Sequence, residues 1–154
     1  MFKKILVPLD GSELASSILP QVAELAKKFQ AELTLIHVSP GEEADLAAPL
    51  RSTAADIHKT CEAYLNFLVR DLQRQGLMIN VVCLTGNPAR EIIRYADEHQ
   101  VDLIAMASHG SGEVAWLLGS IAKKVVTHTS SPVMVFRVLE MELPSLKAKV
   151  KEFI

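Results

Sequence analysis

The stretch that decides the fold is Val101–Val125, with the sequence VDLIAMASHGSGEVAWLLGSIAKKV. It opens with a nearly unbroken apolar run, Val101–Ala107, which is typical of a central parallel strand whose two faces are both covered. Three glycines follow this run, and helix-forming sequence resumes at Ser120. The stretch is therefore predicted to be a buried strand, a glycine-rich loop and a helix that ends near Thr129.

Strands and helices are predicted to alternate along the rest of the chain. Short β-type runs indicate strands, and apolar residues that recur at steps of three and four indicate helices with one buried face. The predicted strands are Lys4–Leu9, Glu32–Val38, Met78–Leu84, Val101–Ala107 and Pro132–Val138. The predicted helices run from Glu13 to Phe29, from Ile57 to Leu72, from Pro88 to Ala96 and from Ser120 to Thr129. Residues 39–52 are expected to form a mobile connection.

Single residues mark several of the predicted helix ends. Ser12 can cap the first helix, Pro20 is expected to bend it, and Gly76 is expected to end the second helix with a left-handed cap. Asn87 is predicted to cap the next helix, with Pro88 at its first position. The helix after Asn87 is therefore the best marked in the chain.

This alternation predicts the α/β fold class. Each pair of parallel strands needs a crossover of about a dozen residues, so the expected architecture is a single, doubly wound, open parallel sheet of five strands with helices on both faces. Such sheets bind ligands beyond the carboxyl ends of their strands, where the strand order reverses. The reversal is expected between the first and fourth strands, which brings Asp10 close to the loop that begins at Ala107.

Composition limits the number of domains and the classes of partner. A chain of 154 residues that is 49% hydrophobic can bury one sizeable core, so one soluble domain is expected. The formal charge is only −2 and the charges are scattered, which disfavours nucleic acid as a partner. No apolar run approaches the roughly 18 residues of a membrane span, and no signal segment is recognisable, so a cytoplasmic location is expected.

The cysteines and histidines give no sign of a metal site. Cys61 and Cys83 lie on a predicted helix and a predicted strand, and neither belongs to a CxxC motif or another ligand spacing. Both are predicted to be buried thiols without a metal or redox role. The five histidines show no H-E-x-x-H or H-x-x-x-H spacing, so no dedicated metal site is expected.

The glycine-rich loop has the chemistry of a phosphate site. A helix that starts after such a loop offers unpaired N–H groups and a partial positive charge. Gly110, Gly112 and Gly119 let a phosphate approach the backbone, and Ser120 adds a hydroxyl donor. The alternative is an ordinary strand-to-helix connection, which uses the same residue types. The loop lacks the lysine of a Walker-A motif, and it follows the fourth strand, unlike a G-x-G-x-x-G dinucleotide fingerprint.

Three side chains near the loop have more than one possible role. Asp10 ends a buried strand, where its carboxylate either serves a ligand or caps the turn at Ser12. His109 could contact a phosphate or act as a base, but it is expected to be a solvated loop histidine, because no carboxylate or nucleophile lies near it in the sequence. Trp116 is expected to anchor the core or the loop, although its place between the glycines would also let it cover a ligand.

Three separated segments resemble the universal stress protein family. They are MFKKILVPLDGSELA at the start, GNPAREII before the fourth strand, and DLIAMASHG followed by LLGSIAKKVVTHTSSPVMVFR. The resemblance covers Met1 to Val138 and implies a sheet of order 3-2-1-4-5, a homodimer through the fifth strand, Pro132–Val138, and, in one branch of the family, bound ATP. It divides the chain into a domain of residues 1–138 and a tail of residues 139–154.

The resemblance also implies the site of an adenine nucleotide, with ATP as the leading ligand and with any Mg²⁺ or Mn²⁺ held by the nucleotide itself. The residues implied are Asp10 beside the nucleoside, Val38 at the adenine, Met106 and Ala107 at the floor, and Gly110, Gly119 and Ser120 at the phosphates. This chain departs from the family motif G-x2-G-x9-G-[S/T] at two points. Ala107 replaces the first glycine, and eight residues rather than nine separate Gly110 from Gly119.

Three functions stay open at this point. The first is a regulatory module of the stress response that binds ATP or a related adenine nucleotide and hydrolyses it slowly or not at all. The second is a dimeric stress or scaffold protein that no longer binds nucleotide. The third is an enzyme related to adenylating enzymes, but the turn DGSELAS contains a single glycine, and no base, nucleophile or metal cage is recognisable. The first reading is preferred, and the protein is expected not to be an enzyme.

The tail is predicted to contain an amphipathic helix. Its apolar residues share one helical face, with lysines opposite; they are Leu143, Leu146, Val150 and Phe153. The simplest role for such a helix is to pack on the second subunit of a dimer. Docking of another protein and weak contact with a membrane surface are the alternatives.

Overall fold

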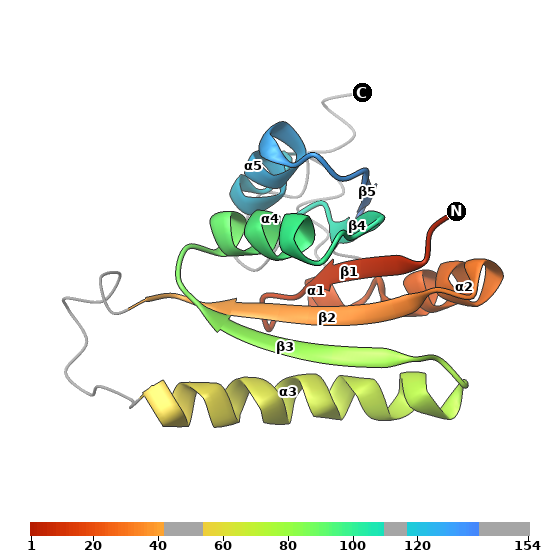
Figure 1. Ribbon diagram of the computed structural model, residues 1–154. Coiled ribbons are helices and arrows are strands. Elements are labelled where there is room, and N and C mark those ends of the chain that lie inside the picture. The colour runs from red at the N-terminus through yellow and green to blue at the C-terminus, as the bar shows by residue number, and fades with distance from the viewer. Residues whose placement is uncertain (42–53, 110–116, 139–154) are drawn as a thin grey trace, which may run out of the picture.

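The computed structural model describes residues 1–41, 54–109 and 117–138 (Figure 1). Predictions for the 42–52 connection, Gly110, Gly112, Trp116 and the tail lie outside the described residues.

The described residues form a five-stranded parallel sheet. Its order is β3-β2-β1-β4-β5, which confirms the predicted fold class and strand order. Hydrophobic side chains point to both faces of the central strands, as expected for parallel strands covered on both sides. The strands are β1 (Lys4–Pro8), β2 (Glu32–Ser39), β3 (Ile79–Thr85), β4 (Leu103–Ala107) and β5 (Val133–Phe136).

Helices cover both faces of the sheet, as predicted. Helices α1, α2 and α3 pack on one face, and α4 and α5 pack on the other, as the separation of α3 from α4 and α5 in Figure 1 shows. Alternate residues of each central strand therefore enter two different cores; Val7 of β1 lies in the first and Leu6 in the second. The helices are α1 (Glu13–Ser16), α2 (Leu19–Phe29), α3 (Ala54–Arg74), α4 (Pro88–Glu98) and α5 (Ser120–His128).

The single helix predicted for residues 13–29 is two helices. The bend expected at Pro20 is a break between α1 and α2, and Pro20 occupies the first turn of α2. Proline lacks an N–H and its ring collides with the carbonyl four residues earlier, so the first turn is the place where a helix tolerates it. Gly76 has a φ of +80°, which agrees with the predicted left-handed end of α3.

The two cysteines form a disulfide, so the prediction of free thiols was wrong. Cys61 of α3 and Cys83 of β3 have Cα atoms 6.1 Å apart, within the range that a disulfide spans. Helix α3 packs along β3 and brings the two residues face to face. Their separation in the sequence gave no hint of this contact, because it depends on how the helix lies on the sheet. Cys61 is buried, as expected.

Asn87 caps α4 as predicted. Its side-chain oxygen accepts a hydrogen bond from the Arg90 N–H at 3.1 Å. We expect Asn87→Ala to lower the free energy of unfolding by about 1 kcal/mol, because this N–H loses its partner at the helix end. Urea unfolding monitored by circular dichroism measures the change. Asn87→Asp keeps an acceptor and is the matched control, so an equal loss in both variants would contradict the role of the cap.

Asp102 ties the amino end of β1 to the start of β4. Its Oδ2 accepts hydrogen bonds from the Lys3 and Lys4 N–H groups, each at 2.8 Å. These two bonds to the charged form hold the pKa of Asp102 below its usual value. Because its pKa is lowered, the ionised Asp102 stabilises the fold at pH values above the ordinary aspartate pKa of about 4. This stabilisation is lost as the pH falls through the lowered pKa of the folded protein.

Asp102→Asn should therefore be less stable than the unmodified protein at neutral pH, and the difference should shrink as the solution is acidified below about pH 4. Urea midpoints measured in steps from pH 7 to pH 2.5 test this expectation. A difference that stays constant over the series would show that the charge of Asp102 is not involved.

Candidate functional site

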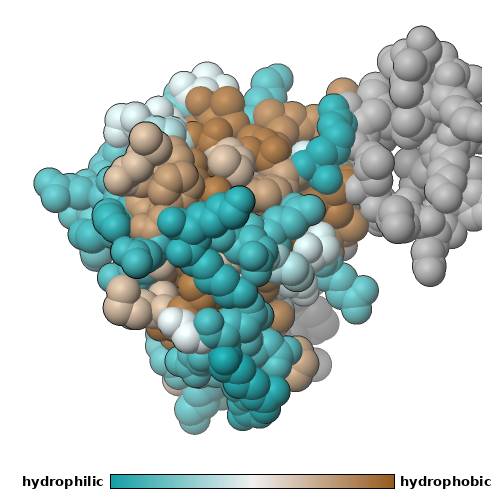
Figure 2. All heavy atoms as spheres, turned by 90° about the vertical axis from the view of Figure 1, so that its right-hand side faces the viewer, coloured by the Kyte–Doolittle hydropathy of each residue, from teal (hydrophilic) through white to brown (hydrophobic). Residues whose placement is uncertain are grey.

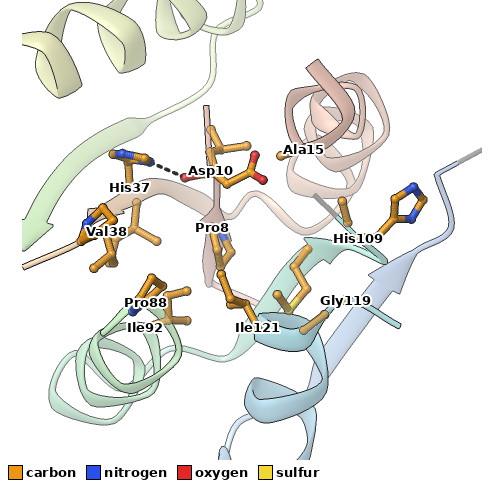
Figure 3. Close-up of a pocket in the computed structure, with 16 residues that line it drawn as sticks. Pro8, Asp10, Ala15, His37, Val38, Pro88, Ile92, His109, Gly119 and Ile121 are labelled. Carbon is orange, nitrogen blue, oxygen red and sulfur yellow. Dashed lines mark hydrogen bonds between the residues drawn. The ribbon is translucent and has the colours of Figure 1, made fainter. Parts of the chain in front are cut away.

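One pocket lies at the carboxyl ends of β1, β2 and β4. It has a volume of about 290 Å³. Its lining residues from the strands and the segments that follow them are Pro8, Leu9, Asp10, Ile36, His37, Val38, Pro40, Met106, Ala107 and His109. Its lining residues from the helices and their ends are Ala15, Pro88, Ile92, Gly119, Ile121 and Ala122. Figure 3 shows His37, Asp10 and Ala15 on one side of this pocket and Ile92, Ile121 and Gly119 on the other.

The strand order explains why the pocket lies here. After β1 the chain turns toward α1 on one face of the sheet, and after β4 it leads to α5 on the opposite face. Because the two connections diverge, a crevice opens between them. The sequence predicted that Asp10 and the segment after Ala107 would meet at this edge, and both line the pocket.

Val38 presents its backbone toward the pocket. Residues of β2 alternate in the direction of their backbone hydrogen bonds: Ile36 accepts one from the Leu9 N–H of the β1 side at 2.9 Å, whereas Ser39 accepts one from Gly86 on the β3 side. Val38, two residues after Ile36, therefore directs its N–H and C=O toward the β1 side. Strand β1 has already ended at Pro8, so these groups face the space that the pocket occupies.

Asp10 both lines the pocket and orders the turn that follows β1. Its Oδ1 accepts hydrogen bonds from the N–H of Ser12, at 2.9 Å, and from the hydroxyl of Ser12. The Ser12 hydroxyl oxygen in turn accepts the Ala15 N–H at 3.1 Å and caps α1. The two roles weighed for Asp10 are thus compatible, since the turn fixes the carboxylate at the edge of the pocket.

His109 is buried, so the expectation of a solvated loop histidine was wrong. It is only 3% exposed, and its Nδ1 lies 3.0 Å from Ser108 Oγ. The neighbouring Ser108 donates its N–H to the Phe136 carbonyl, and its Oγ accepts from the Val138 N–H, so the contact with β5 continues beyond the end of β4. Within the part of the chain that the structure describes, His109 Nε2 has no hydrogen-bond partner.

The residues predicted to face phosphate are only partly assembled in the described structure. Gly119 lines the pocket, but its N–H donates to the Ser108 carbonyl at 2.7 Å and is already engaged. Ser120 begins α5 beside the pocket and is not one of its lining residues. Met106 and Ala107 are buried and line the pocket from β4. Gly110 lies outside the described residues.

Sequence reasoning missed His37. It lines the pocket, and its Nδ1 lies 2.7 Å from the Leu9 carbonyl oxygen, to which it donates because a carbonyl can only accept (Figure 3). The sequence signal that could have indicated this role is the position of His37 just before Val38, near the carboxyl end of a buried strand, where the pocket lies. Histidine spacing along the chain indicates metal motifs, but it cannot reveal a role that depends on how the strands pair.

A comparison with protein families decides the classification. The model of the universal stress protein family matches residues 1–137. The chain belongs to the universal stress protein family. A relative, Universal stress protein YxiE of Bacillus subtilis, is 32% identical over 153 residues, which cover 89% of this chain and all of the relative.

Solved structures of similar proteins share the fold. The structure of MJ0577, a protein of Methanocaldococcus jannaschii, has a TM-score of 0.74 at 26% identity and covers 91% of this chain and 99% of its own. A universal stress protein in complex with cAMP has a TM-score of 0.68 at 19% identity, covering 90% and 98%. The Archaeoglobus fulgidus universal stress protein in complex with dAMP has a TM-score of 0.66 at 22% identity, covering 87% and 97%.

The described residues contain no helix that is both long and apolar enough to cross a lipid bilayer. The same residues contain no group of three or more histidine, cysteine or acidic side chains that could hold a metal ion.

Proposed function

We propose that the pocket between β1 and β4 binds an adenine nucleotide, with ATP as the leading ligand, and that the protein is a regulatory module of the stress response rather than an enzyme. One observation carries this proposal: a carboxylate, the backbone of Val38 and the start of α5 surround a single pocket at the switch point of the sheet. Solved structures of universal stress proteins in complex with cAMP and with dAMP support an adenine nucleotide as the ligand class.

The base would lie on the side of the pocket formed by β2 and α4. Ile36, Pro88 and Ile92 offer apolar surface there, which suits the faces of a flat aromatic ring. The N–H and C=O of Val38 would pair with the edge of the adenine, because one donor and one acceptor on the same residue can match its ring nitrogen and amino group. Met106 and Ala107 would form the floor.

The sugar and the phosphates would extend toward α1 and α5. The Asp10 carboxylate would accept hydrogen bonds from ribose hydroxyls, which are donors of the right kind. The positive end of α5 favours an anion. The Gly119 N–H is engaged by the Ser108 carbonyl, so Gly119 would not donate to a phosphate but would leave room for it by having no side chain. Ser120 and Gly110 are proposed as the donors.

Released nucleotide and calorimetry test this proposal. Purified protein is denatured and the supernatant is analysed for adenine nucleotides, and ATP, AMP and cAMP are then titrated into the nucleotide-free protein. Binding of at least one of them is expected, with no more than slow turnover of excess ATP. If none is released and none binds, the nucleotide site is refuted and the dimeric scaffold function is favoured.

A homodimer through β5 is proposed as the assembly. Strand β5 is an edge strand, and edge strands pair readily with a second copy. The exposed hydrophobic residues of this region are Leu117, Leu118, Val126 and Val135. In Figure 2 hydrophobic residues gather at the top of the molecule, where Figure 1 places α5. A cytoplasmic location is proposed as well.

Light scattering on eluting protein tests the dimer. The expected mass is twice that of the chain, and Val135→Lys should reduce it to a single chain by placing a charge in the strand interface. Phe67→Lys, which changes an exposed residue of α3 beside the opposite edge of the sheet, is the matched control and should stay dimeric. A single-chain mass for the unmodified protein would contradict the proposed assembly.

A further inference from the structure

The disulfide joins two elements at the same end of the sheet as the pocket. Cys61 lies in the first half of α3 and is buried, whereas Cys83 lies near the carboxyl end of β3 and is partly exposed. Strand β3 is an edge strand, so no further strand of the described sheet shields Cys83 from the outside. Of the two cysteines, Cys83 is therefore the one that a small reductant would meet first.

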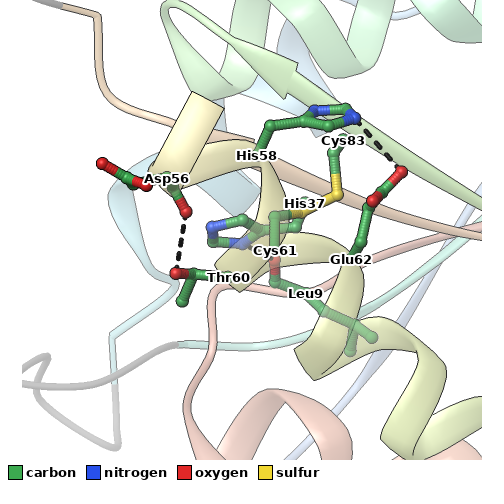
Figure 4. Close-up of a disulfide and its surroundings, with 8 residues drawn as sticks. All are labelled: Leu9, His37, Asp56, His58, Thr60, Cys61, Glu62 and Cys83. Carbon is green, nitrogen blue, oxygen red and sulfur yellow. Dashed lines mark hydrogen bonds and ion pairs between the residues drawn. A yellow bond between two sulfur atoms is a disulfide. The ribbon is translucent and has the colours of Figure 1, made fainter. Parts of the chain in front are cut away.

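His37 connects the disulfide to the pocket. In the pairing of β2 with β3, His37 stands directly opposite Cys83, so the two side chains project from the same face of the sheet. Figure 4 shows the His37 ring beside the disulfide, on the side toward Leu9. The same ring donates its Nδ1–H to the Leu9 carbonyl, and Leu9 directly precedes Asp10 in the wall of the pocket.

Tyr64 gives a second connection from the same helix. It follows Cys61 by one turn of α3, and its ring contacts the His37 ring edge-on, with ring centres 6.2 Å apart. Burial of its hydroxyl, and after that the negative charge of Asp10, raise the pKa of Tyr64, while the Gly11 backbone acts in the opposite direction. The hydroxyl therefore lies near the turn that presents the Asp10 carboxylate.

We infer that Cys61 and Cys83 form a redox modification site that sets the affinity of the pocket: the oxidised chain binds adenine nucleotide more tightly than the reduced chain. The inference rests on the proposed function, because it concerns the regulation of the same pocket. The disulfide holds α3 against β3, and this contact keeps Tyr64 and His37 packed behind Leu9 and Asp10.

The chemistry is thiol–disulfide exchange with a small thiol or a dithiol protein as the reductant. Its thiolate attacks Cys83 Sγ, the sulfur–sulfur bond breaks, and Cys61 leaves as a thiolate that takes up a proton. A second thiolate attacks the mixed disulfide and releases Cys83, which is protonated in turn. Two electrons pass to the protein, the two reductant thiols become one disulfide, and both cysteines end as thiols.

Reduction changes the packing because two thiol sulfurs cannot stay at the bonded distance of about 2 Å. The contact between α3 and β3 must loosen at this point, and the contact between Tyr64 of α3 and His37 of β2 lies next to it. We expect nucleotide affinity to fall roughly 10-fold on reduction, which is within the range of coupling between two sites in a protein. By reciprocity, saturating nucleotide should make the disulfide harder to reduce by the same factor.

The experiment uses the full chain in two forms. AMP and ATP are titrated by calorimetry into the oxidised protein and into protein reduced with excess dithiothreitol. The fraction of disulfide is also measured in dithiothreitol redox buffers with and without saturating nucleotide. A weaker affinity after reduction, matched by the shift in the redox equilibrium, supports the inference. Equal affinities for the two forms overturn it.

A double variant and a ligand-free measurement complete the test. Cys61→Ala/Cys83→Ala should bind with the affinity of the reduced protein and should not respond to dithiothreitol. If no nucleotide binds either form, the proposed function fails, and the imidazole NMR signals of His37 decide whether the disulfide controls the pocket wall. A shift of these signals on reduction, with His99 unchanged as an internal reference, supports that control, and unchanged His37 signals contradict it.

Discussion

Asp10→Asn is expected to weaken nucleotide binding about 30-fold while the fold stays intact, which corresponds to about 2 kcal/mol. A hydrogen bond to a charged acceptor contributes roughly 1.5–3 kcal/mol, and the neutral amide gives up that charge at the ribose. The amide oxygen still accepts the Ser12 N–H, so the turn after β1 is retained. Calorimetric titration measures the affinity, and urea unfolding confirms that the variant is folded.

Ser12→Ala separates the two roles of Asp10. This variant loses the cap of α1, because the Ser12 hydroxyl accepts the Ala15 N–H, and should cost about 1 kcal/mol in stability. Its affinity for nucleotide should fall much less than that of Asp10→Asn, since Ser12 does not line the pocket and its N–H still holds the Asp10 carboxylate. An Asp10→Asn variant with unchanged affinity would show that the carboxylate only orders the turn.

Removing the link between Cys61 and Cys83 is expected to lower the free energy of unfolding by about 3 kcal/mol. The bond closes a loop over a sequence separation of 22, and in the chain-entropy account it restricts the unfolded chain more than the folded one. Urea unfolding of the oxidised protein, the reduced protein and the Cys61→Ala/Cys83→Ala variant measures this difference.

The double variant is also the control for the reductant itself. Its unfolding midpoint should not respond to dithiothreitol, whereas that of the unmodified protein should fall to a similar value. The alanine at position 61 removes a buried sulfur and adds a smaller packing loss of its own. Identical midpoints for the oxidised and reduced unmodified protein would show that the disulfide does not stabilise the native state.

The fold could be predicted because its signals are local. The apolar run of β4 is buried along its whole length, as its sequence predicted. The alternation of strands and helices along the chain predicts a parallel sheet. The cap at Asn87 and the glycine at Gly76 are set by backbone geometry within a few residues. Asp10 was also within reach, because the carboxyl ends of parallel strands meet at one edge of the sheet, whereas Val38 was implied only by the resemblance to the family.

The missed features all depend on contacts between distant segments. The position of His37 in the pocket wall and opposite Cys83 follows from the pairing of β2 with β3. The buried His109 follows Ser108, which is hydrogen-bonded to β5 and to the residue two positions after it. The disulfide requires the long α3 to lie along β3 at one register. Periodicity within a segment defines which face is apolar, but it does not determine which neighbour that face meets.

Whether the disulfide between α3 and β3 is closed depends on the cellular compartment of the protein. Glutathione keeps most protein thiols reduced in the cytosol, whereas secreted and periplasmic proteins retain their disulfides. In the cytosol the disulfide would close only while oxidants accumulate, and it would mark the protein transiently as oxidised. In the second setting the link would be a permanent brace, and alkylation of freshly lysed cells distinguishes the two.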